Sequence, residues 1–380
     1  MRRSVITIAA STLVIVSSAG VAFAFTAKQF DWGLPEWVPI PVVPSDNPMT
    51  IEKVELGRHL FYDKRLSVDK TMSCATCHQQ DKAFTDRKSL SKGVTGEEAK
   101  RSAMTLVNVA YLPVLTWANP LLTSVEVQAL IPIFGEHPIE MGMAGKEALL
   151  FDRLKTDPTY QKLFKKAFPQ ESMLGDGSLY SLSTITKALA SFQRTLISVN
   201  SPYDRYRYGG QSSAITPAAK RGEALFFGEK MECYHCHGGF NFTDNIKHSR
   251  MPFPELGFHN TGLYNVDGKG RYPIGHTGIE EFTANPGDMG KFRTPTLRNI
   301  AKTAPYMHDG SIPDLASVIR IHYAKAGRSA SSPGGVNPLR SKFMTGFQVT
   351  EEEVRDLVAF LESLTDEQIL VDKRFSDPWR

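Results

Sequence analysis

The chain has 380 residues, with 44 Lys and Arg against 40 Asp and Glu, 41% hydrophobic residues and four Cys. That length suits one large domain or two ordinary ones, and the composition excludes collagen-like, low-complexity and mainly disordered proteins. A formal net charge of +4 without a basic cluster argues against a nucleic-acid partner, and four Cys are too few for a disulfide scaffold.

The first residues have the pattern of a secretory signal peptide. Two arginines near the start precede an apolar run over residues 5–21, and the small residues Ala22 and Ala24 fit an A-x-A cleavage site. An uncleaved anchor is the alternative, because the run is nearly long enough to span a bilayer. The hydroxyl residues in the run and the cleavage site favour removal of residues 1–24. We therefore expect a periplasmic protein cleaved after Ala24.

The next segments predict an extended arm followed by short helices. Residues 25–49 are rich in proline, which favours an irregular arm. Thr50 is a good N-cap for a helix over residues 50–62. Residues 146–168 predict two amphipathic helices broken at Asp157-Pro158.

The rest of the chain predicts two longer helices and one long loop region. An apolar stripe at helical spacing marks residues 182–197 as a helix, and a Ser-, Gly- and Pro-rich boundary follows at residues 200–217. Residues 238–295 are rich in Gly and Pro and poorly periodic, as expected for loops that wrap a ligand. Thr350 and Glu353 form a capping box for a helix that ends at Leu364.

All four cysteines fall in two copies of C-x-x-C-H, which are Cys74-Ala75-Thr76-Cys77-His78 and Cys233-Tyr234-His235-Cys236-His237. This is the attachment motif of c-type haem, in which two thioethers hold the porphyrin and the adjacent imidazole ligates the iron. A zinc site would need C-x-x-C pairs about 15–20 residues apart, and a thioredoxin-like pair gives no reason for the trailing His. The sequence predicts two covalent c-type haems with proximal ligands His78 and His237.

The flanks of the two motifs also resemble one another. Residues 56–62 match residues 221–227 before the motifs, and residues 83–86 match residues 241–244 after them. A repeat with this long period indicates an internal duplication.

The expected fold is therefore mainly α, with long irregular loops and two cytochrome c-like haem domains. We place the first haem domain at residues 50–212 and the second at residues 213–380.

These residues resemble bacterial dihaem cytochrome c peroxidases and their MauG-like relatives over essentially all of the mature chain. The strings that carry the resemblance are residues 56–58, 61–63, both haem motifs, Trp117, residues 128–132, 140–142 and 292–310. Longer stretches resemble the MbnH-type dihaem enzymes of methanobactin gene clusters; these are residues 116–120, 134–138 and 258–268, with the arm string 30–35 in support.

The resemblance implies that one haem reacts with hydrogen peroxide while the other stores or relays an electron. The peroxide site needs an open iron position and a group that moves a proton across the O–O bond. The family's distal glutamate matches Glu140 and its companion matches Gln128, although the segment before Glu140 is slightly longer than usual. Trp117 matches an aromatic that passes electron holes between the haems; a packing Trp is the alternative.

One departure from the peroxidase pattern concerns the first haem. Many peroxidases of this group carry a His, between the first motif and the aromatic, that closes the first iron until activation. Residues 79–117 contain no His. We therefore expect a five-coordinate first haem that reacts with peroxide without prior reduction, as in MauG-like enzymes.

The distal ligand of the second haem has two candidates. Peroxidases use Met on the helix after the His-Asp-Gly turn and MauG uses Tyr, but here residues 318–323 offer no Met. Counting forward from Thr303 places His322 in the ligand position, whereas matching backward places Tyr323 there with one extra residue. A π-bulge absorbs such a residue. We favour Tyr323.

The family also commonly binds calcium between the haems. Thr303 and Pro305 match the carbonyl donors, but Ser102 stands where the family has Asn. One calcium ion is therefore a weaker expectation than the two haems.

Three functions remain in competition. The first is a periplasmic oxidase in which hydrogen peroxide oxidises the haem pair by two electrons and a side chain of a partner protein is then oxidised. The MbnH-type resemblance implies a Trp of a copper-binding periplasmic partner, converted to kynurenine. The second is a cytochrome c peroxidase that reduces peroxide with electrons from a small donor protein. The third is a dihaem electron carrier, against which Glu140 and Gln128 argue.

Overall fold

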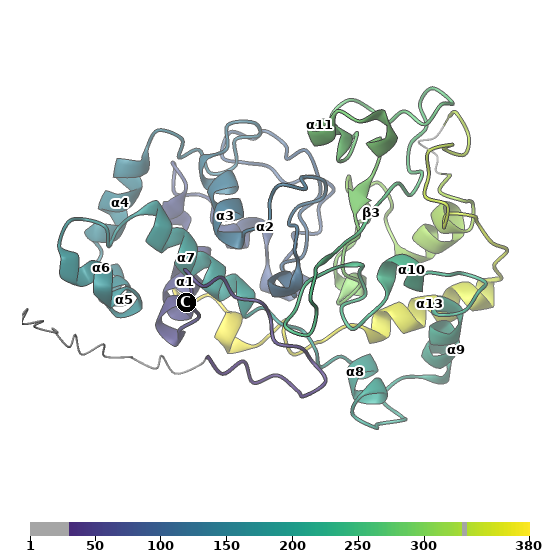
Figure 1. The fold of residues 1–380 in the computed structure, drawn as a ribbon, viewed down its shortest axis with the longest axis horizontal. Helices are drawn as coiled ribbons and strands as arrows, with labels where there is room; N and C mark the ends of the chain where they lie inside the picture. The colour runs from purple at the N-terminus through teal and green to yellow at the C-terminus, as the bar shows by residue number, and fades with distance from the viewer. Residues whose placement is uncertain (1–29, 329–332) are drawn as a thin grey trace, which may run out of the picture. The chain divides into compact units, whose positions relative to one another are not determined.

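The computed structural model describes residues 30–328 and 333–380, so the predicted signal peptide lies outside the described residues. Residues 32–380 form one compact unit, and everything below concerns this unit. As predicted, this unit is mainly helical (Figure 1). The strands of its described residues form two small two-stranded sheets. No helix in the described part of the chain is long and apolar enough to cross a membrane.

The first half of the unit contains seven helices and three single turns of 3₁₀ helix within the described residues. They are α1 (Ile51–Tyr62), η1 (Lys64–Leu66), α2 (Cys74–Cys77), η2 (Gln80–Lys82), η3 (Val109–Tyr111), α3 (Val125–Phe134), α4 (Glu147–Lys155), α5 (Pro158–Ala167), α6 (Pro169–Leu174) and α7 (Leu182–Arg194).

The second half follows from residue 202 and adds the sheets. Its elements are α8 (Pro202–Arg207), α9 (Pro217–Phe226), α10 (Tyr234–His237), β1 (Asn245–Ile246), β2 (Glu255–Leu256), β3 (Phe258–His259), α11 (Glu280–Thr283), η4 (Pro286–Asp288), β4 (Phe292–Arg293), η5 (Ile300–Lys302), α12 (Leu315–Ser317), the π-helix η6 (Val318–Tyr323), α13 (Glu351–Ser363) and η7 (Lys373–Phe375).

The local signals for helix ends hold in the structure. The Thr50 hydroxyl accepts a hydrogen bond from the Lys53 amide at the start of α1. Asp157 separates α4 from α5 and caps α5 by accepting from two amides. The capping box of Thr350 and Glu353 starts α13 as predicted. Helix α7 ends at Arg194, three residues before the predicted end, and the hydroxyl of its C-cap residue Thr195 donates to the Phe192 carbonyl.

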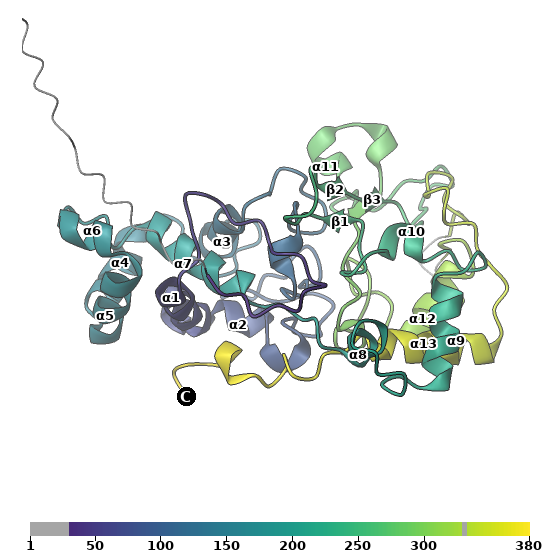
Figure 2. The same ribbon diagram turned by 60° about the horizontal axis from the view of Figure 1, so that its bottom comes forward.

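The two halves are each built on one close helix pair. Helix α1 packs on α7, and helix α9 packs on α13 (Figures 1 and 2). A Cβ atom at Gly57 would lie 1.9 Å from the Ala188 carbonyl oxygen, and one at Gly222 would lie 2.0 Å from the Asp356 carbonyl oxygen. Both glycines are therefore required by close backbone approach.

The C-terminal segment returns to the first half. After α13, Ile369, Leu370 and Phe375 are buried in the same apolar core as α1 and α7. The Tyr62 hydroxyl donates to the Phe375 carbonyl, and the guanidinium of Arg58 donates to two carbonyls of this tail. Figure 1 shows the yellow chain end beside α1. The tail thus follows a helix of the second half but packs on the first half. The predicted boundaries of the haem domains remain a prediction.

The long segment predicted as loops is tied down by the short sheets. Strands β1 and β2 pair antiparallel with Asn245 opposite Leu256, and β3 and β4 pair with Phe258 opposite Arg293. The second pairing closes residues 258–293 into one excursion. These pairings hold in place a segment that has little other regular structure.

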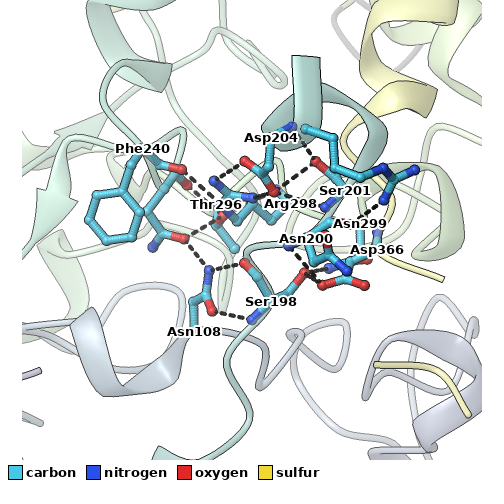
Figure 3. Close-up of polar contacts among 12 residues, drawn as sticks. Asn108, Ser198, Asn200, Ser201, Asp204, Phe240, Thr296, Arg298, Asn299 and Asp366 are labelled. Atoms are coloured by element: carbon cyan, nitrogen blue, oxygen red, sulfur yellow. Dashed lines mark hydrogen bonds and ion pairs between the residues drawn. The ribbon is translucent and has the colours of Figure 1, made fainter. Parts of the chain in front are cut away.

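A buried polar network joins the halves (Figure 3). Asn108 of the first half donates to Ser198 and Asn241, and Asn299 of the second half donates to the hydroxyl of the same Ser198. Beside it the guanidinium of Arg298 makes a two-pronged ion pair with Asp204, at 2.8 and 2.9 Å, with both side chains buried. Because these buried groups are paired, a shift of one half against the other would leave several of them unsatisfied.

Candidate haem sites and the region between them

The first motif forms a single helical turn, and its His follows as the C-cap residue. Helix α2 begins at Cys74, where Ser73 and Thr76 form a reciprocal capping box. The His78 ring then lies 2.9 Å, Nδ1 to oxygen, from the carbonyl of Phe84, which has a left-handed backbone conformation. An Nδ1–H that donates to a carbonyl leaves Nε2 with its lone pair free for a metal.

The second motif has the same arrangement. Its helix α10 includes His237, whose Nδ1 lies 3.1 Å from the carbonyl oxygen of Phe242, again with a left-handed backbone. Burial lowers the pKa of both ring systems, His78 and His237, so both imidazoles are neutral at physiological pH. A neutral imidazole with one nitrogen anchored is the form that ligates iron.

None of the four motif cysteines forms a disulfide within the described residues. Burial raises the pKa of Cys74 to about 12, of Cys77 to about 11 and of Cys233 to about 12, so these sulfurs carry no charge. Two cysteine sulfurs beside one anchored imidazole make the donor set of a covalent c-type haem, and both halves supply it. The residues of both motifs therefore fit the predicted haems.

A largely apolar cavity opens beside the second motif. Its walls include Cys233, Cys236, His237, Tyr323, Phe292 and Trp117. The cavity is shared with the first half, since Thr85, from the turn that follows the first motif, also lines it. A flat apolar cofactor attached at Cys233 and Cys236 would occupy this space.

Arg293 is a buried cation in the wall of this cavity that the sequence did not single out. Its guanidinium donates to the carbonyls of Thr116 and Thr294 and to the Met104 sulfur, with no carboxylate partner among the described residues. Burial lowers the pKa of Arg293 to about 10. A cation buried without a counter-charge is costly, so this position suits an anionic group such as a haem propionate. Arg293 lies within residues 292–310, which resemble the family, but no local pattern in the sequence marks it as a buried cation.

The two candidate distal ligands lie on a π-helix, which is the feature needed to absorb one extra residue. Tyr323 lines the cavity, and burial raises its pKa above the ordinary value. His322 is not among the described residues that line the cavity. Its ring is fully buried, and neither nitrogen has a hydrogen-bond partner in the described part of the chain. Tyr323 remains the proposed ligand.

Glu140 lies near the first motif on a loop fixed to α3. The amides of Met141 and Met143 donate to the carbonyls of Pro132 and Ile133, and Val94 donates to the Glu140 carbonyl. Burial raises the pKa of Glu140, and its charge in turn acts on Cys74 and Cys77. A carboxyl whose proton is held to a higher pH is suited to acid–base work.

Gln128 lies on α3, one turn before Pro132. Pro132, four residues after Gln128, has no backbone N–H. The Gln128 carbonyl therefore lacks its usual hydrogen bond within the helix. Helix α3 is held against α7 by Glu126, which pairs with both terminal nitrogens of Arg194 at 2.7 and 2.9 Å. The structure thus gives Gln128 a fixed backbone near the Glu140 loop; its role stays a prediction.

Trp117 is held at the meeting of the two halves. Its indole N–H donates to the Ser102 carbonyl at 2.8 Å, and its own carbonyl accepts from the Arg293 amide at 2.8 Å. It lines the cavity that also contains His237. Thr303 and Pro305, the predicted calcium donors, line the same cavity. The Ser102 carbonyl is already engaged by Trp117, and calcium stays a prediction.

Comparisons with known proteins agree with this geometry. The family model described as di-haem cytochrome c peroxidase matches residues 51–212. The chain is 35% identical over 356 residues to the methylamine utilization protein MauG of Methylophilus methylotrophus, covering 93% of each chain. It is 34% identical over 370 residues to the cytochrome-c peroxidase IdrP1 of Pseudomonas sp. (strain SCT), covering 93% of this chain and 91% of the relative.

A solved structure is more similar still. It is described as a MauG-like protein associated with microbial copper homeostasis, and it is 47% identical with a TM-score of 0.87. The match covers 92% of this chain and 100% of that one.

Proposed function

The chain belongs to the MauG-like dihaem cytochrome c peroxidase superfamily, and we propose that it oxidises a side chain of a partner protein at the expense of hydrogen peroxide. Membership makes it a peroxide-dependent oxidoreductase with two c-type haems. The finer proposal is that the target is a Trp converted to kynurenine, on a copper-binding partner. The similarity to a MauG-like protein associated with copper homeostasis supports that partner class.

When bound, the haems supply peroxide activation and storage of oxidising equivalents. The observation that carries the choice of partner oxidation is Tyr323 in the wall of the cavity beside the second motif, where peroxidases of the family use Met. A phenolic oxygen favours oxidised iron more than a thioether does, since Met ligation raises the reduction potential. A second site that favours the oxidised state is suited to holding an oxidising equivalent until a partner arrives.

At the first site Glu140 performs the proton transfer. Burial raises its pKa, so its carboxyl exchanges a proton at a pH closer to neutrality than an ordinary Glu. The loop that carries it is held by the backbone of α3, and Gln128 from the same helix orients the bound peroxide. No His in residues 79–117 can close this site, which leaves it open to peroxide.

Between the sites Trp117 carries an electron hole from one half to the other. The indole N–H of Trp117 donates to the Ser102 carbonyl, and Trp117 lines the cavity beside the second motif. Two further expectations belong to the same proposal: a calcium ion at Thr303 and Pro305, and export to the periplasm with cleavage after Ala24.

A cytochrome c peroxidase is the second candidate, because IdrP1 is almost as similar in sequence as MauG is. The test incubates the holoenzyme with peroxide and a small copper-binding protein from the same gene neighbourhood, then measures the partner by mass spectrometry. Partner oxidation is expected at one Trp, with kynurenine absorbance, in the native enzyme and not in Glu140→Gln. Rapid turnover with reduced cytochrome c and an unmodified partner would instead support the peroxidase.

A further inference from the structure

A cluster of aromatic rings forms part of the wall of the cavity beside the second motif and extends beyond it to Tyr264. His308 lines the cavity, and its ring stacks on Phe292 with centroids 3.9 Å apart. Tyr272 also lines the cavity. The Tyr264 ring lies 5.5 Å from that of Tyr272 and 6.3 Å from that of His308, centroid to centroid. Tyr264 is therefore one ring contact away from the wall of the second haem site.

Tyr264 is bonded to a carboxylate that can take its proton. Its hydroxyl donates to Asp309 Oδ2 at 2.5 Å. Burial of Asp309 opposes ionisation, but the nearby His308 and the hydrogen bonds from Tyr264 and Ser311 outweigh it, so the Asp309 pKa lies below its usual range. Tyr272, by contrast, donates to the neutral amide oxygen of Asn260. The two neighbouring tyrosines thus differ in whether a base is in contact.

Tyr264 is also held rigidly and lies close to the surface. Its carbonyl accepts from the Asn337 amide at 2.6 Å, and the next residue, Asn265, accepts from Gly270. Its side chain is half-buried, while Val266 two residues on is 44% exposed. A rigid phenol between cavity and solvent needs little reorganisation when its charge changes.

We propose that Tyr264, with Asp309 as its proton acceptor, is the redox relay through which electrons from a partner's side chain reach the second haem site. In each cycle Tyr264 loses one electron to the peroxide-oxidised haem pair, and its phenolic proton moves along the existing hydrogen bond to Asp309 Oδ2. An electron from the partner's aromatic side chain then reduces Tyr264, and the same proton returns. Two cycles deliver the two electrons that reduce the pair. This inference rests on the proposed function.

Two other tyrosines in the described chain also donate to carboxylates, and they serve as comparisons. Tyr203 donates to Glu223 at 2.9 Å and Tyr160 donates to Asp63 at 2.8 Å. The Tyr160 pair is buried in the core of the first half. The Tyr203 ring contacts Phe242, 5.6 Å between centroids, and Phe is far harder to oxidise than Tyr or Trp. Tyr203→Phe is therefore a matched control.

The experiment compares the native holoenzyme with Tyr264→Phe, Asp309→Asn and Tyr203→Phe after one equivalent of peroxide and without partner. Freeze-quench EPR with ring-deuterated tyrosine reports the tyrosyl radical, and absorption reports the lifetime of the oxidised haem pair. The native protein and Tyr203→Phe should give a deuterium-sensitive tyrosyl signal. Tyr264→Phe should lose it, and its oxidised state should live at least about tenfold longer. Asp309→Asn should also weaken the tyrosyl signal and lengthen the lifetime of the oxidised haem pair.

The possible results distinguish a failure of the Tyr264 relay from a failure of the proposed partner oxidation. If peroxide oxidises the haem pair but the radical yield and lifetime in Tyr264→Phe equal those of the native protein, the relay is wrong and the proposed function stands. A native protein with no tyrosyl signal, and the same lifetime in all variants, also overturns the relay. If peroxide fails to oxidise the native haem pair, the proposed function itself fails. Unchanged haem spectra before peroxide show that each variant folds.

Discussion

In the first half Gly57 of α1 lies against the Ala188 carbonyl of α7, and in the second half Gly222 of α9 lies against the Asp356 carbonyl of α13. Both motif histidines then point Nδ1 at the carbonyl of a Phe with a left-handed backbone. The proximal side of each site is thus built by the same local pattern, which is consistent with the proposed duplication.

The distal sides of the two sites have nothing in common. The first half supplies Glu140 on a loop fixed to α3, whereas the second supplies Tyr323 on a π-helix and a cavity wall of aromatic rings. Because the repeated pattern fixes attachment and proximal ligation, the difference in chemistry must come from these unrepeated segments. Under the proposed function, the first half carries the peroxide chemistry and the second stores an oxidising equivalent.

The largest expected effect comes from removing the acid–base group of the first half. Glu140→Gln should slow the reaction with peroxide about 10²–10⁴-fold while both haems remain attached. The raised pKa of Glu140 means that the base form is gained as pH rises through a midpoint above 4.5. The native rate should therefore fall on acidification through that midpoint, and the variant should lose this dependence. Stopped-flow absorption across pH measures both, and an unchanged rate in Glu140→Gln would contradict the assignment.

The shared scaffold predicts matched stability effects in the two halves. Gly57→Ala and Gly222→Ala each push a Cβ into a carbonyl oxygen, and each should destabilise by about 1–3 kcal/mol. Ala224→Ser, on the exposed face of α9, is the control and should be nearly neutral. Thermal unfolding of the holoenzyme measures all three. If only one of the two glycine substitutions lowers the stability, the two halves are not built on equivalent helix pairs.

The distal ligand of the second haem can be tested by measuring the reduction potential of that haem. Tyr323→Met should raise the reduction potential of the second haem, since thioether ligation favours reduced iron. His322→Gln should leave it nearly unchanged, because His322 is not among the described residues lining the cavity. Spectroelectrochemical titration decides between them, and the reverse pattern would make His322 the ligand.

The smallest effect concerns the helix that carries Gln128. Burial of Glu126 raises its pKa, but Arg194 and Asn47 outweigh burial and bring it to about 2. A carboxyl with a depressed pKa stabilises the fold above about pH 4.5, and this contribution is lost as pH falls toward 2. Glu126→Gln should therefore flatten the pH dependence of unfolding between these values. An identical pH profile in the variant would show that the pair contributes nothing.

The local sequence was sufficient for the repeated parts of this molecule. The spacing in both C-x-x-C-H motifs predicted the donor sets, and Thr50, Asp157 and Thr350 marked helix starts that the structure contains. These features depend on neighbours in the chain. The one-residue mismatch with the family pattern before Tyr323 is what a π-bulge absorbs, and the structure has a π-helix there; this expectation came from the resemblance and not from the local sequence.

Features that depend on distant residues were not visible in the sequence. Arg293 carries no local sign of burial, and its position follows only from the pairing of β3 with β4. Tyr264 and Asp309 are 45 positions apart, so their hydrogen bond required the fold. The tail around Phe375 was assigned to the second domain, yet it packs with the first-half core. Each of these contacts is set by tertiary packing.

The most direct test of the difference between the halves is absorption and EPR of the purified ferric protein before and after one equivalent of peroxide. The account predicts a high-spin signal from the open first haem together with a low-spin signal from the second. Peroxide should then produce a long-lived near-infrared charge-resonance band without prior reduction. An all-low-spin ferric protein that ignores peroxide until it is half-reduced would contradict the account and indicate a conventional dihaem peroxidase.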